Sequence, residues 1–354
     1  MPKKLTNNQI NYRANQFLLC KNSSDIEHLL KLTHFTFAQH ILSPQYFYFK
    51  IPKNKGGFRE IEAPAPELKK IQRKLNEYLQ YVYFLNQSQS AYGFIMSTAK
   101  ENRKNTAKNI VSNAKQHLGN PYLLNIDFDD YFHQISTKEV YDIFKKAPFH
   151  FTKNQANTLS KICTNKGRLP MGAPTSPVLS NFACLALDKE LELWATKHQI
   201  TYTRFVDDLS FSSKNKITQQ HFKQILQITS KHQFKIDPAK TKWYDAEQTK
   251  IVTGLVIGNQ IELQKTYLNE LSKDLNRLQK ATEVAIITGN INKPTATKKF
   301  KQEVMGKINF IAVVKGYSSA QYEHFMMLYE QAINPPNKDQ LSMRWTDFSN
   351  YTNF

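Results

Sequence analysis

Two kinds of hydrophobic pattern alternate along this chain, and together they predict a mixed α+β fold. Residues 66–85 carry apolar side chains at helical spacing with basic residues between them, which is typical of an amphipathic helix. Residues 1–45 have apolar patches that also indicate helices. Tyr46–Pro52 and Arg59–Glu62 have the character of strands, and the basic, glycine-containing segment 53–57 between them predicts a hairpin.

The central part, residues 120–245, predicts the order strand, helix, helix, hairpin, helix. The predicted strands are Tyr122–Asp127, Ile200–Phe205 and Leu209–Ser213. Ser136 and Ser176 are expected to open the two helices before the hairpin, and the second helix should run to about Lys197. A further helix is expected from about Thr218 to His232. This order is that of a split βαβ palm, and it disfavours a doubly wound parallel sheet.

The remaining elements are also helical or hairpin-like. Ser24–Glu27 resembles a capping box for a short helix, and Asn105–His117 predicts a basic helix. Ile251–Ile257 and Gln260–Leu263 predict a hairpin across the two-residue turn Gly258-Asn259. Beyond residue 265 the pattern is helical and basic to about residue 333, with a loop near 289–294 and a polar tail.

Two adjacent carboxylates, Asp207 and Asp208, fall at the tip of the central hairpin. They repel each other there, so a cation is their natural counter-charge. Asp127 ends another apolar run, and the three carboxylates together fit a two-metal phosphoryl-transfer site. Asp-Asp pairs are also common in plain turns, which is the alternative. Asp129 and Asp130 lie nearby, and Asp129, which faces the same way as Asp127, is a minor candidate ligand.

Charge and composition narrow the class of function. Lys and Arg number 48 against 29 Asp and Glu, a formal net charge of +19, which suits a polyanionic partner such as nucleic acid. A merely soluble basic protein, or one that meets anionic membranes, is the alternative. No Gly-x-Gly-x-x-Gly or Walker A motif is present, which disfavours dinucleotide enzymes and ATPases of that kind.

The sequence also predicts where the protein works. No stretch approaches the roughly 18 apolar residues of a membrane span, and Phe17–Cys20 is too short for a signal peptide. Cys20, Cys163 and Cys184 are far apart and have no zinc-ligand spacing. We therefore expect a reduced, cytoplasmic protein without a structural metal cluster.

Three longer motifs resemble those of reverse transcriptases and occur in the same order. Asn125–Phe132 is similar to the first palm motif, and Gly167–Asn181 is similar to the second. Phe205–Asp208 resembles the Tyr-x-Asp-Asp box. The resemblance spans roughly residues 45–265.

Two shorter elements point to the retron family, the bacterial enzymes that make msDNA. Asn113–His117 is similar to that family's Asn-Ala-x-x-His element, and Val252–Gly254 is similar to its Val-Thr-Gly element. Each match is weak alone, but both lie in register around the polymerase motifs.

The resemblance implies a right-hand polymerase. Its fingers, with N-terminal helices, would cover residues 1–120, its split βαβ palm 121–263, and its small helical thumb with the tail 264–354. Two Mg²⁺ ions would be held by Asp127 and Asp207. Asp208 would be a third, weaker ligand or a partner of the ligands.

The resemblance also implies nucleotide-binding residues, each with a plainer alternative. Arg59 resembles the fingers arginine that lies against the incoming nucleotide, and Lys53 or Lys55 would contact its phosphates. Phe132 sits where the family keeps an aromatic ring against the sugar; an ordinary core residue is the alternative. The remaining candidates are Met171, Gly172, which permits close backbone approach, and Lys240, which resembles a lysine near the pyrophosphate but is also typical of a protein surface.

RNA contacts are expected in three places. Asn113 and His117 lie one helical turn apart and would contact RNA or serve as scaffold. Thr253 and Gly254 would lie in a strand that touches the primer or the RNA, with sheet packing as the alternative. The third place is the basic helical region after residue 265, with Lys273, Arg277, Lys280, Lys298, Lys299, Lys301 and Lys307.

This sequence departs from the family pattern in three places. Met171 stands where the family usually has Gln, and Phe205-Val206 stands where it has Tyr-Ala. These changes remove polar contacts near the template or nucleotide and add bulk, which bears on fidelity and nucleotide affinity. The third is an insertion-like basic stretch within Met96–Asn105.

The resulting hypothesis is RNA-templated DNA synthesis from dNTPs. The template and primer would be one structured non-coding RNA, primed from a 2′-hydroxyl, and the product would be a branched RNA–DNA hybrid. The family's wider role implies anti-phage defence with a separate effector protein in the bacterial cytoplasm. The alternatives are another bacterial reverse transcriptase, of the group II intron or abortive-infection kind, and a non-catalytic RNA-binding scaffold.

Overall fold

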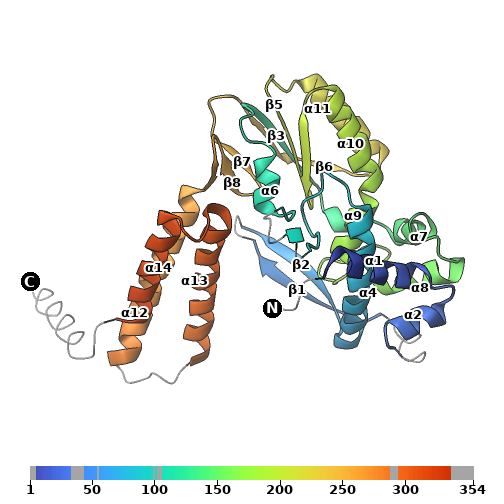
Figure 1. Ribbon diagram of the computed structural model, residues 1–354, viewed down its shortest axis with the longest axis horizontal. Coiled ribbons are helices and arrows are strands. Elements are labelled where there is room, and N and C mark those ends of the chain that lie inside the picture. The colour runs from blue at the N-terminus through green and yellow to red at the C-terminus, as the bar shows by residue number, and fades with distance from the viewer. Residues whose placement is uncertain are drawn as a thin grey trace, which may run out of the picture. The chain divides into compact units, whose positions relative to one another are not determined.

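The chain has two compact units, Met1–Gln248 and Thr249–Phe354 (Figure 1). Each unit contains its own sheet structure, helices and buried apolar residues, and each is described by itself. The computed structural model describes residues 5–32, 44–53, 56–98, 100–101, 106–287 and 294–335 of the 354. Within these residues, no helix is long and apolar enough to cross a membrane.

The first unit opens with the predicted helices and hairpin: α1 (Asn7–Leu18), α2 (Ser23–Leu29), β1 (Tyr46–Pro52), β2 (Phe58–Pro64) and α4 (Pro66–Asn86). Strands β1 and β2 pair antiparallel along their whole length, which confirms the hairpin. The amphipathic pattern of α4 is confirmed too, because its apolar face is buried at Leu68, Ile71, Leu75 and Leu79. The capping box of α2 is formed by Asn22 and Asp25, so the predicted box at Ser24–Glu27 is wrong by two residues.

The β1–β2 hairpin carries an unusual amount of exposed apolar surface. Five large side chains on it are at least 45% exposed: Phe47, Tyr48, Phe49, Ile51 and Phe58. A sheet of only two strands leaves much of its two faces uncovered by neighbouring strands, so this exposure follows from the architecture.

The palm sheet has four strands in the order β4-β5-β3-β6, and all neighbouring strands are antiparallel. The strands are β3 (Tyr122–Phe128), β4 (Thr201–Phe205), β5 (Asp208–Ser213) and β6 (Ile236–Tyr244). The first three confirm the predicted strands. Strand β6 was not predicted, because it contains Pro238 and charged residues and lies at the edge of the sheet, where such residues are tolerated.

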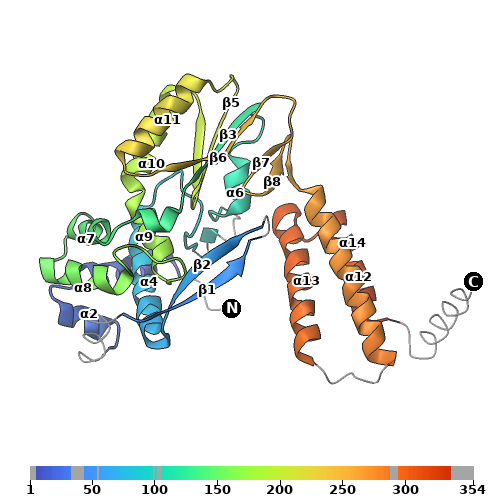
Figure 2. The same cartoon turned by 180° about the vertical axis from the view of Figure 1, so that it is seen from behind.

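Helices connect these strands (Figure 2). They are the 3₁₀ turn η1 (Tyr131–Gln134), α7 (Thr137–Lys145), α8 (Lys153–Cys163), α9 (Ser176–Ala183), α10 (Leu185–Lys197) and α11 (Gln219–Lys231). Helix α10 packs against β4 and α11. The single helix predicted from Ser176 to Lys197 is in fact two helices that meet at Cys184.

Two other helical predictions need correction. Asn109 caps α6 (Ile110–Lys115), which is therefore much shorter than the predicted helix over 105–117. Thr175, not Ser176, is the N-cap residue of α9, and the Ser176 hydroxyl donates instead to the Pro170 carbonyl at 2.7 Å.

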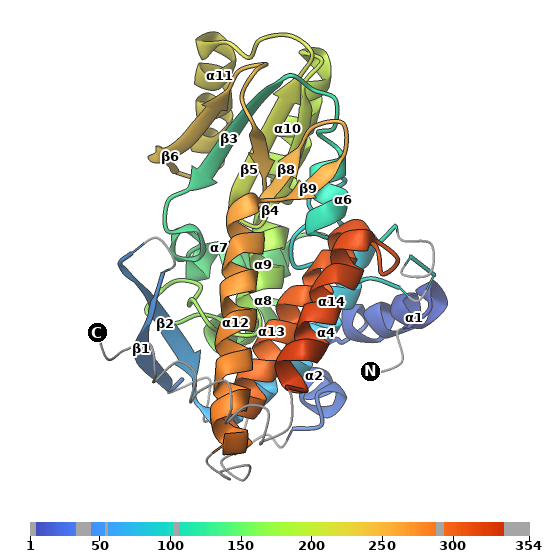
Figure 3. The ribbon, with the colours of Figure 1, turned by 90° about the vertical axis from the view of Figure 1, so that its left-hand side faces the viewer.

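The second unit combines a small sheet with helices (Figure 3). Strands β7 (Lys250–Val252), β8 (Leu255–Ile257) and β9 (Ile261–Leu263) pair antiparallel in sequence order. Helices α12 (Lys265–Ile287), α13 (Pro294–Lys315) and α14 (Ala320–Ile333) pack on one another. The predicted loop near 289–294 and the polar tail beyond 335 lie outside the described residues, except that Pro294 begins α13.

The Val-Thr-Gly element occupies a turn. Val252 ends β7, and Thr253 and Gly254 have φ angles of +47° and +83° in the tight connection to β8. The expectation that Val252–Gly254 is a continuous strand is therefore wrong, and the glycine meets the need for a positive φ in the turn.

Candidate active site

The register of the palm sheet brings the predicted carboxylates together. On β3, Asp127 pairs with Asp208 of β5 on one side and with Asp237 of β6 on the other. Asp207 lies in the two-residue turn between β4 and β5, since Phe205 pairs with Asp208. Four carboxylates thus gather at one end of the sheet, and Asp237 is the one that the sequence did not reveal.

This crowding changes how readily the carboxylates ionise. Loss of contact with water raises the pKa of Asp207, and the negative charge of Asp127 raises it further. The pKa of Asp208 is raised for the same reasons, with Asp207 and Asp127 both contributing. Because burial and mutual repulsion disfavour the ionised forms of these carboxylates, a bound cation would stabilise the site.

Lys240 supplies part of the counter-charge. Its Nζ donates to Asp127 Oδ1 at 2.6 Å and lies 3.3 Å from Asp237 Oδ2. Partial burial opposes the charge of Lys240, but the hydrogen bond to Asp127 outweighs it and the lysine pKa is raised. Among the described residues, no three His, Cys, Asp or Glu side chains already converge as ligands of one ion.

A cavity of about 760 Å³ lies beside these carboxylates. Its walls combine acidic, basic and aromatic side chains from the β1–β2 hairpin, η1 and the palm. Of the residues expected to bind nucleotide, it is lined by Lys53, Arg59, Phe132, Met171 and Lys240, together with Asp207 and Asp208. Lys55 lies outside the described residues. The cavity is large enough for a nucleoside triphosphate and has the charges to hold one.

Phe132 occupies a defined place in this cavity. The ring is partly buried, with its centroid 5.4 Å from that of Tyr131 and 6.5 Å from that of Phe94. All three rings line the cavity, so aromatic packing holds Phe132 at the cavity wall, where a residue in contact with the sugar would lie.

The backbone of Gly172 closely approaches Ile61 and Glu62 of β2. With φ at +125°, a Cβ on this residue would lie 2.9 Å from Ile61 Cγ2 and 3.1 Å from the Glu62 carbonyl oxygen. The Glu62 amide donates to the Met171 carbonyl at 2.7 Å. The second palm motif is therefore docked on β2, and Gly172 is required for that contact whatever its role toward a nucleotide.

Glu62 is a second residue that sequence reasoning missed. Its buried carboxylate accepts hydrogen bonds from Arg168 Nη1 at 2.6 Å and Asn165 Nδ2 at 2.7 Å, and it lies 2.9 Å from His133 Nε2. Burial opposes its ionisation, but these partners outweigh burial and lower its pKa. Glu62 thus ties β2 to the palm loops. No local sequence signal marks it, because its partners are about 70 to 106 residues away.

Asn113 and His117 are fully buried, so neither side chain can contact RNA. This corrects the RNA-contacting expectation and leaves the scaffold alternative. The His117 Nδ1 atom lies 2.7 Å from Ser212 Oγ, and its Nε2 atom lies 2.7 Å from Thr203 Oγ1. It therefore joins the segment after α6 to β4 and β5, the two strands of the hairpin that carries Asp207 and Asp208. Burial lowers its pKa to about 3.

The expected RNA-binding residues of the second unit are more accessible. Gly254 is exposed and Thr253 partly so. Lys273, Arg277, Lys280, Lys298 and Lys299 are exposed, and Lys301 and Lys307 are partly exposed. Some of this charge is paired, since Lys307 Nζ lies 2.5 Å from Asp274, and Arg277 3.7 Å from it. A cavity of about 450 Å³ lies between α12 and α13 beside these three residues.

The palm sheet, its clustered carboxylates and the adjacent cavity define the class of protein as a template-directed nucleotidyl-transfer polymerase. Residues 51–257 match the family model described as reverse transcriptase (RNA-dependent DNA polymerase). The chain belongs to this reverse transcriptase family. Its similarity to retron reverse transcriptases identifies it as a retron-type, RNA-directed DNA polymerase.

Three relatives illustrate the similarity. The Escherichia coli retron Ec83 reverse transcriptase is 27% identical over 243 residues, covering 64% of this chain and 74% of that protein. The Escherichia coli retron Ec73 enzyme is 30% identical over 249 residues, covering 65% and 75%. The Myxococcus xanthus retron Mx162 enzyme is 29% identical over 257 residues, covering 64% of this chain but only 50% of that protein.

Among solved structures, a telomerase from Candida albicans aligns with a TM-score of 0.42 and 10% identity, covering 84% of this chain and 61% of that chain. Likeness at this level adds nothing to the family assignment.

Proposed function

We propose that the chain copies a structured non-coding RNA into DNA, starts from a 2′-hydroxyl of that RNA and leaves a branched RNA–DNA product. The observation that carries this proposal is the convergence of Asp127, Asp207 and Asp208 beside a cavity lined by Arg59 and Phe132. The similarity to retron reverse transcriptases supports the choice of RNA.

We also propose two Mg²⁺ ions as cofactors. The donors are carboxylate oxygens, which Mg²⁺ prefers. Burial and the neighbouring carboxylates raise the pKa values of Asp207 and Asp208 although Lys240 lies nearby, which supports additional positive charge from bound ions. Asp127 and Asp207 would hold the ions, with Asp208 as a weaker partner. Bound there, the ions would activate the primer hydroxyl and neutralise the leaving pyrophosphate.

The chain's own residues would do the rest. Lys53 and Arg59 would donate to the triphosphate, because both line the cavity and both side chains offer several N–H donors. Phe132 would lie against the sugar. Lys240 would keep its positive charge next to the phosphates, since its raised pKa holds the proton on it.

The test is carboxylate substitution in primer extension with an RNA template. Asp127→Asn and Asp207→Asn should each abolish DNA synthesis and leave RNA binding nearly intact, because each removes a metal ligand and no phosphate contact. Asp208→Asn should be less damaging. Asp130→Asn is the matched control, since that exposed carboxylate lines the same cavity and is not among the expected ligands. Extension at the wild-type rate in Asp127→Asn would show that the site is wrong.

The remaining partners are proposed from the retron resemblance. We expect one RNA species, covalently joined to DNA, to co-purify with the protein from the bacterial cytoplasm, and a separate effector protein to act with it in anti-phage defence. Sequencing the co-purifying nucleic acid tests this. Unbranched RNA in its place would favour the group II intron-like or abortive-infection alternatives. Bound RNA without any extension would favour the scaffold.

A further inference from the structure

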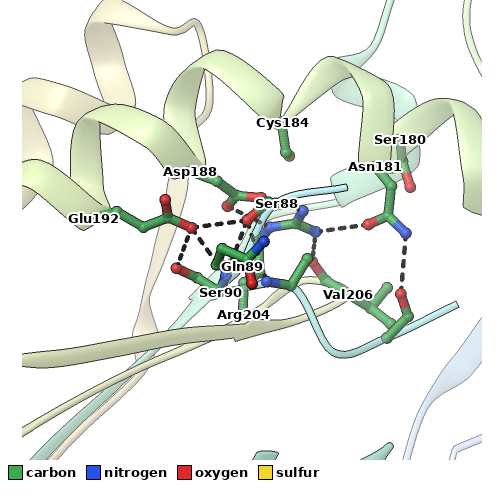
Figure 4. A network of polar contacts seen from close by, with 12 residues as sticks. Ser88, Gln89, Ser90, Ser180, Asn181, Cys184, Asp188, Glu192, Arg204 and Val206 are labelled. Atoms are coloured by element: carbon green, nitrogen blue, oxygen red, sulfur yellow. Dashed lines mark hydrogen bonds and ion pairs between the residues drawn. The ribbon is translucent and has the colours of Figure 1, made fainter. Parts of the chain in front are cut away.

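Arg204 is the largest side chain that is completely buried in the described part of the protein. It lies on β4, two residues before Val206, which forms the β4–β5 turn together with Asp207. Its guanidinium forms a bidentate ion pair with Asp188 of α10, with Nε 2.8 Å from Oδ1 and Nη2 2.7 Å from Oδ2 (Figure 4). Asp188 is completely buried too, and Tyr202 also donates to it at 2.9 Å.

The third nitrogen of the guanidinium points toward the active site. Nη1 donates to the carbonyl oxygen of Val206 at 3.0 Å and to Asn181 Oδ1 at 3.1 Å (Figure 4). Val206 is the residue directly before Asp207, and its φ of +64° is a costly conformation for a β-branched residue. The hydrogen bond from Arg204 therefore holds a strained peptide next to a predicted metal ligand.

The opposite side of the same turn is held by residues 90–93. The Arg204 amide donates to the Ser90 carbonyl at 2.8 Å, and the Tyr92 amide donates to the Arg204 carbonyl at 2.9 Å. Asn181 Nδ2 donates to the Gly93 carbonyl at 3.0 Å, and a Cβ on Gly93 would lie only 2.6 Å from Val206 Cγ2. The turn thus sits between a guanidinium and a glycine that leaves room for it.

Stability alone does not explain this arrangement. A buried ion pair loses the hydration of both charges, and apolar residues of similar volume often stabilise a protein as well or better. What apolar residues cannot do is bind a backbone carbonyl and an amide oxygen with one rigid, planar group.

We infer that Arg204, oriented by Asp188, is a positioning residue for polymerisation: by holding the Val206 carbonyl it sets the place of Asp207 and Asp208. The inference rests on the proposed function only in that these carboxylates serve the reaction. Arg204 itself touches no substrate.

The first test is Arg204→Lys, which keeps the charge opposite Asp188 but loses the planar fork. Turnover in primer extension should fall at least tenfold, while the KM for dNTP should stay within twofold, because the nucleotide-binding side chains are unchanged. Hydrogen exchange of the amides in residues 203–211 should become at least tenfold faster, a readout that does not depend on activity.

The second test separates positioning from stability. The double variant Asp188→Leu with Arg204→Met removes both buried charges together, so it avoids leaving one of them unpaired. If the pair only stabilises the fold, a double variant that melts at the wild-type temperature should recover full turnover. We expect turnover to stay at least tenfold low. The matched control is Tyr202→Phe, which removes one hydrogen bond to Asp188 but neither of those from Arg204 to Val206 and Asn181.

The outcomes distinguish the possible failures. Turnover and exchange within twofold of wild type in Arg204→Lys would overturn the inference. So would equal losses in Tyr202→Phe. If wild-type protein shows no extension, the proposed function fails, and the hydrogen-exchange comparison alone decides whether Arg204 positions the hairpin.

Discussion

His117 is neutral in the folded protein because it is buried between two hydroxyl groups of the palm sheet. Burial lowers its pKa from the ordinary 6.5 to about 3. In the unfolded chain the same imidazole takes up a proton below about pH 6.5. The unfolded state therefore binds the proton more readily, and folding stability is lost as the pH falls from about 6.5 toward 3.

Replacing His117 by Gln should flatten this acid dependence, because Gln has no proton to take up. The measurement is the urea midpoint at several pH values between 7.5 and 4.5. The variant can be less stable at every pH, so the slope is the decisive quantity. His324→Gln, at an exposed position on α14, is the control and should keep the wild-type slope. A wild-type slope in His117→Gln would contradict the assignment.

Phe132 should set the preference for deoxynucleotides. A ring against the sugar leaves no room for a 2′-hydroxyl and gives it no hydrogen-bond partner. Phe132→Ala should raise ribonucleotide incorporation at least tenfold, which corresponds to about 1.4 kcal/mol. If Phe132 is only a packing residue, truncation costs roughly 3–5 kcal/mol of stability and leaves sugar preference unchanged. Measuring sugar discrimination beside melting temperature separates the two.

The position of the turn between β4 and β5 depends on its close packing against Gly93. Gly93→Ala would place a methyl group 2.6 Å from Val206 Cγ2 and 2.8 Å from its backbone nitrogen, so the turn must shift. We expect turnover to fall at least tenfold. Gly306→Ala is the control, because a Cβ on that residue of α13 meets nothing within 4 Å and should stabilise the helix by up to about 1 kcal/mol. Unchanged turnover in Gly93→Ala would mean that the turn tolerates displacement.

Elements with a strong local pattern were predicted well. Strands β3, β4 and β5 and helix α4 have clear apolar periodicity, and the structure confirms them. Strand β6 was missed because only its pairing with β3 makes it a strand. Helix α8 was missed although Thr152 and Gln155 form a capping box at its start, a signal that could have found it.

The residues of the candidate active site also divide into those that a local sequence pattern predicts and those that it does not. Asp127 and Asp207 could be found from the sequence because each ends or follows a recognisable strand within a motif. Asp237, Glu62 and Arg204 could not, because their roles arise from the register of distant strands and from loops far apart in the chain. Asn113 and His117 were found as a motif, but their burial depends on tertiary packing that the motif does not encode.

The net charge of +19 should make RNA binding strongly salt-dependent, because each phosphate contact releases counterions. Lys273, Arg277 and Lys280 recur at helical spacing on α12 and are exposed. Changing all three to Gln should lower the slope of log affinity against log salt by about two to three if each meets a phosphate. The control changes Arg73, Lys138 and Lys223, exposed residues of the first unit. An equal loss in both variants would mean that α12 has no special role.

Shape recognition should dominate the choice of RNA, since side chains cannot read the deep major groove of an A-form helix. The triple variant should therefore weaken binding to all RNAs alike.

The exposed apolar side chains of the β1–β2 hairpin affect how the protein associates in solution. Phe47, Phe49 and Ile51 lie on one face of this two-stranded sheet, and Tyr48 and Phe58 lie on the other. Among the described strands β1 pairs only with β2, so its outer edge can pair with another copy. At low ionic strength, repulsion between like-charged molecules keeps such surfaces apart. Concentrated salt, which strips bound nucleic acid from the protein, also shortens the screening length to about 3 Å at 1 M. Nucleic-acid-free protein should therefore scatter more light as the salt concentration rises.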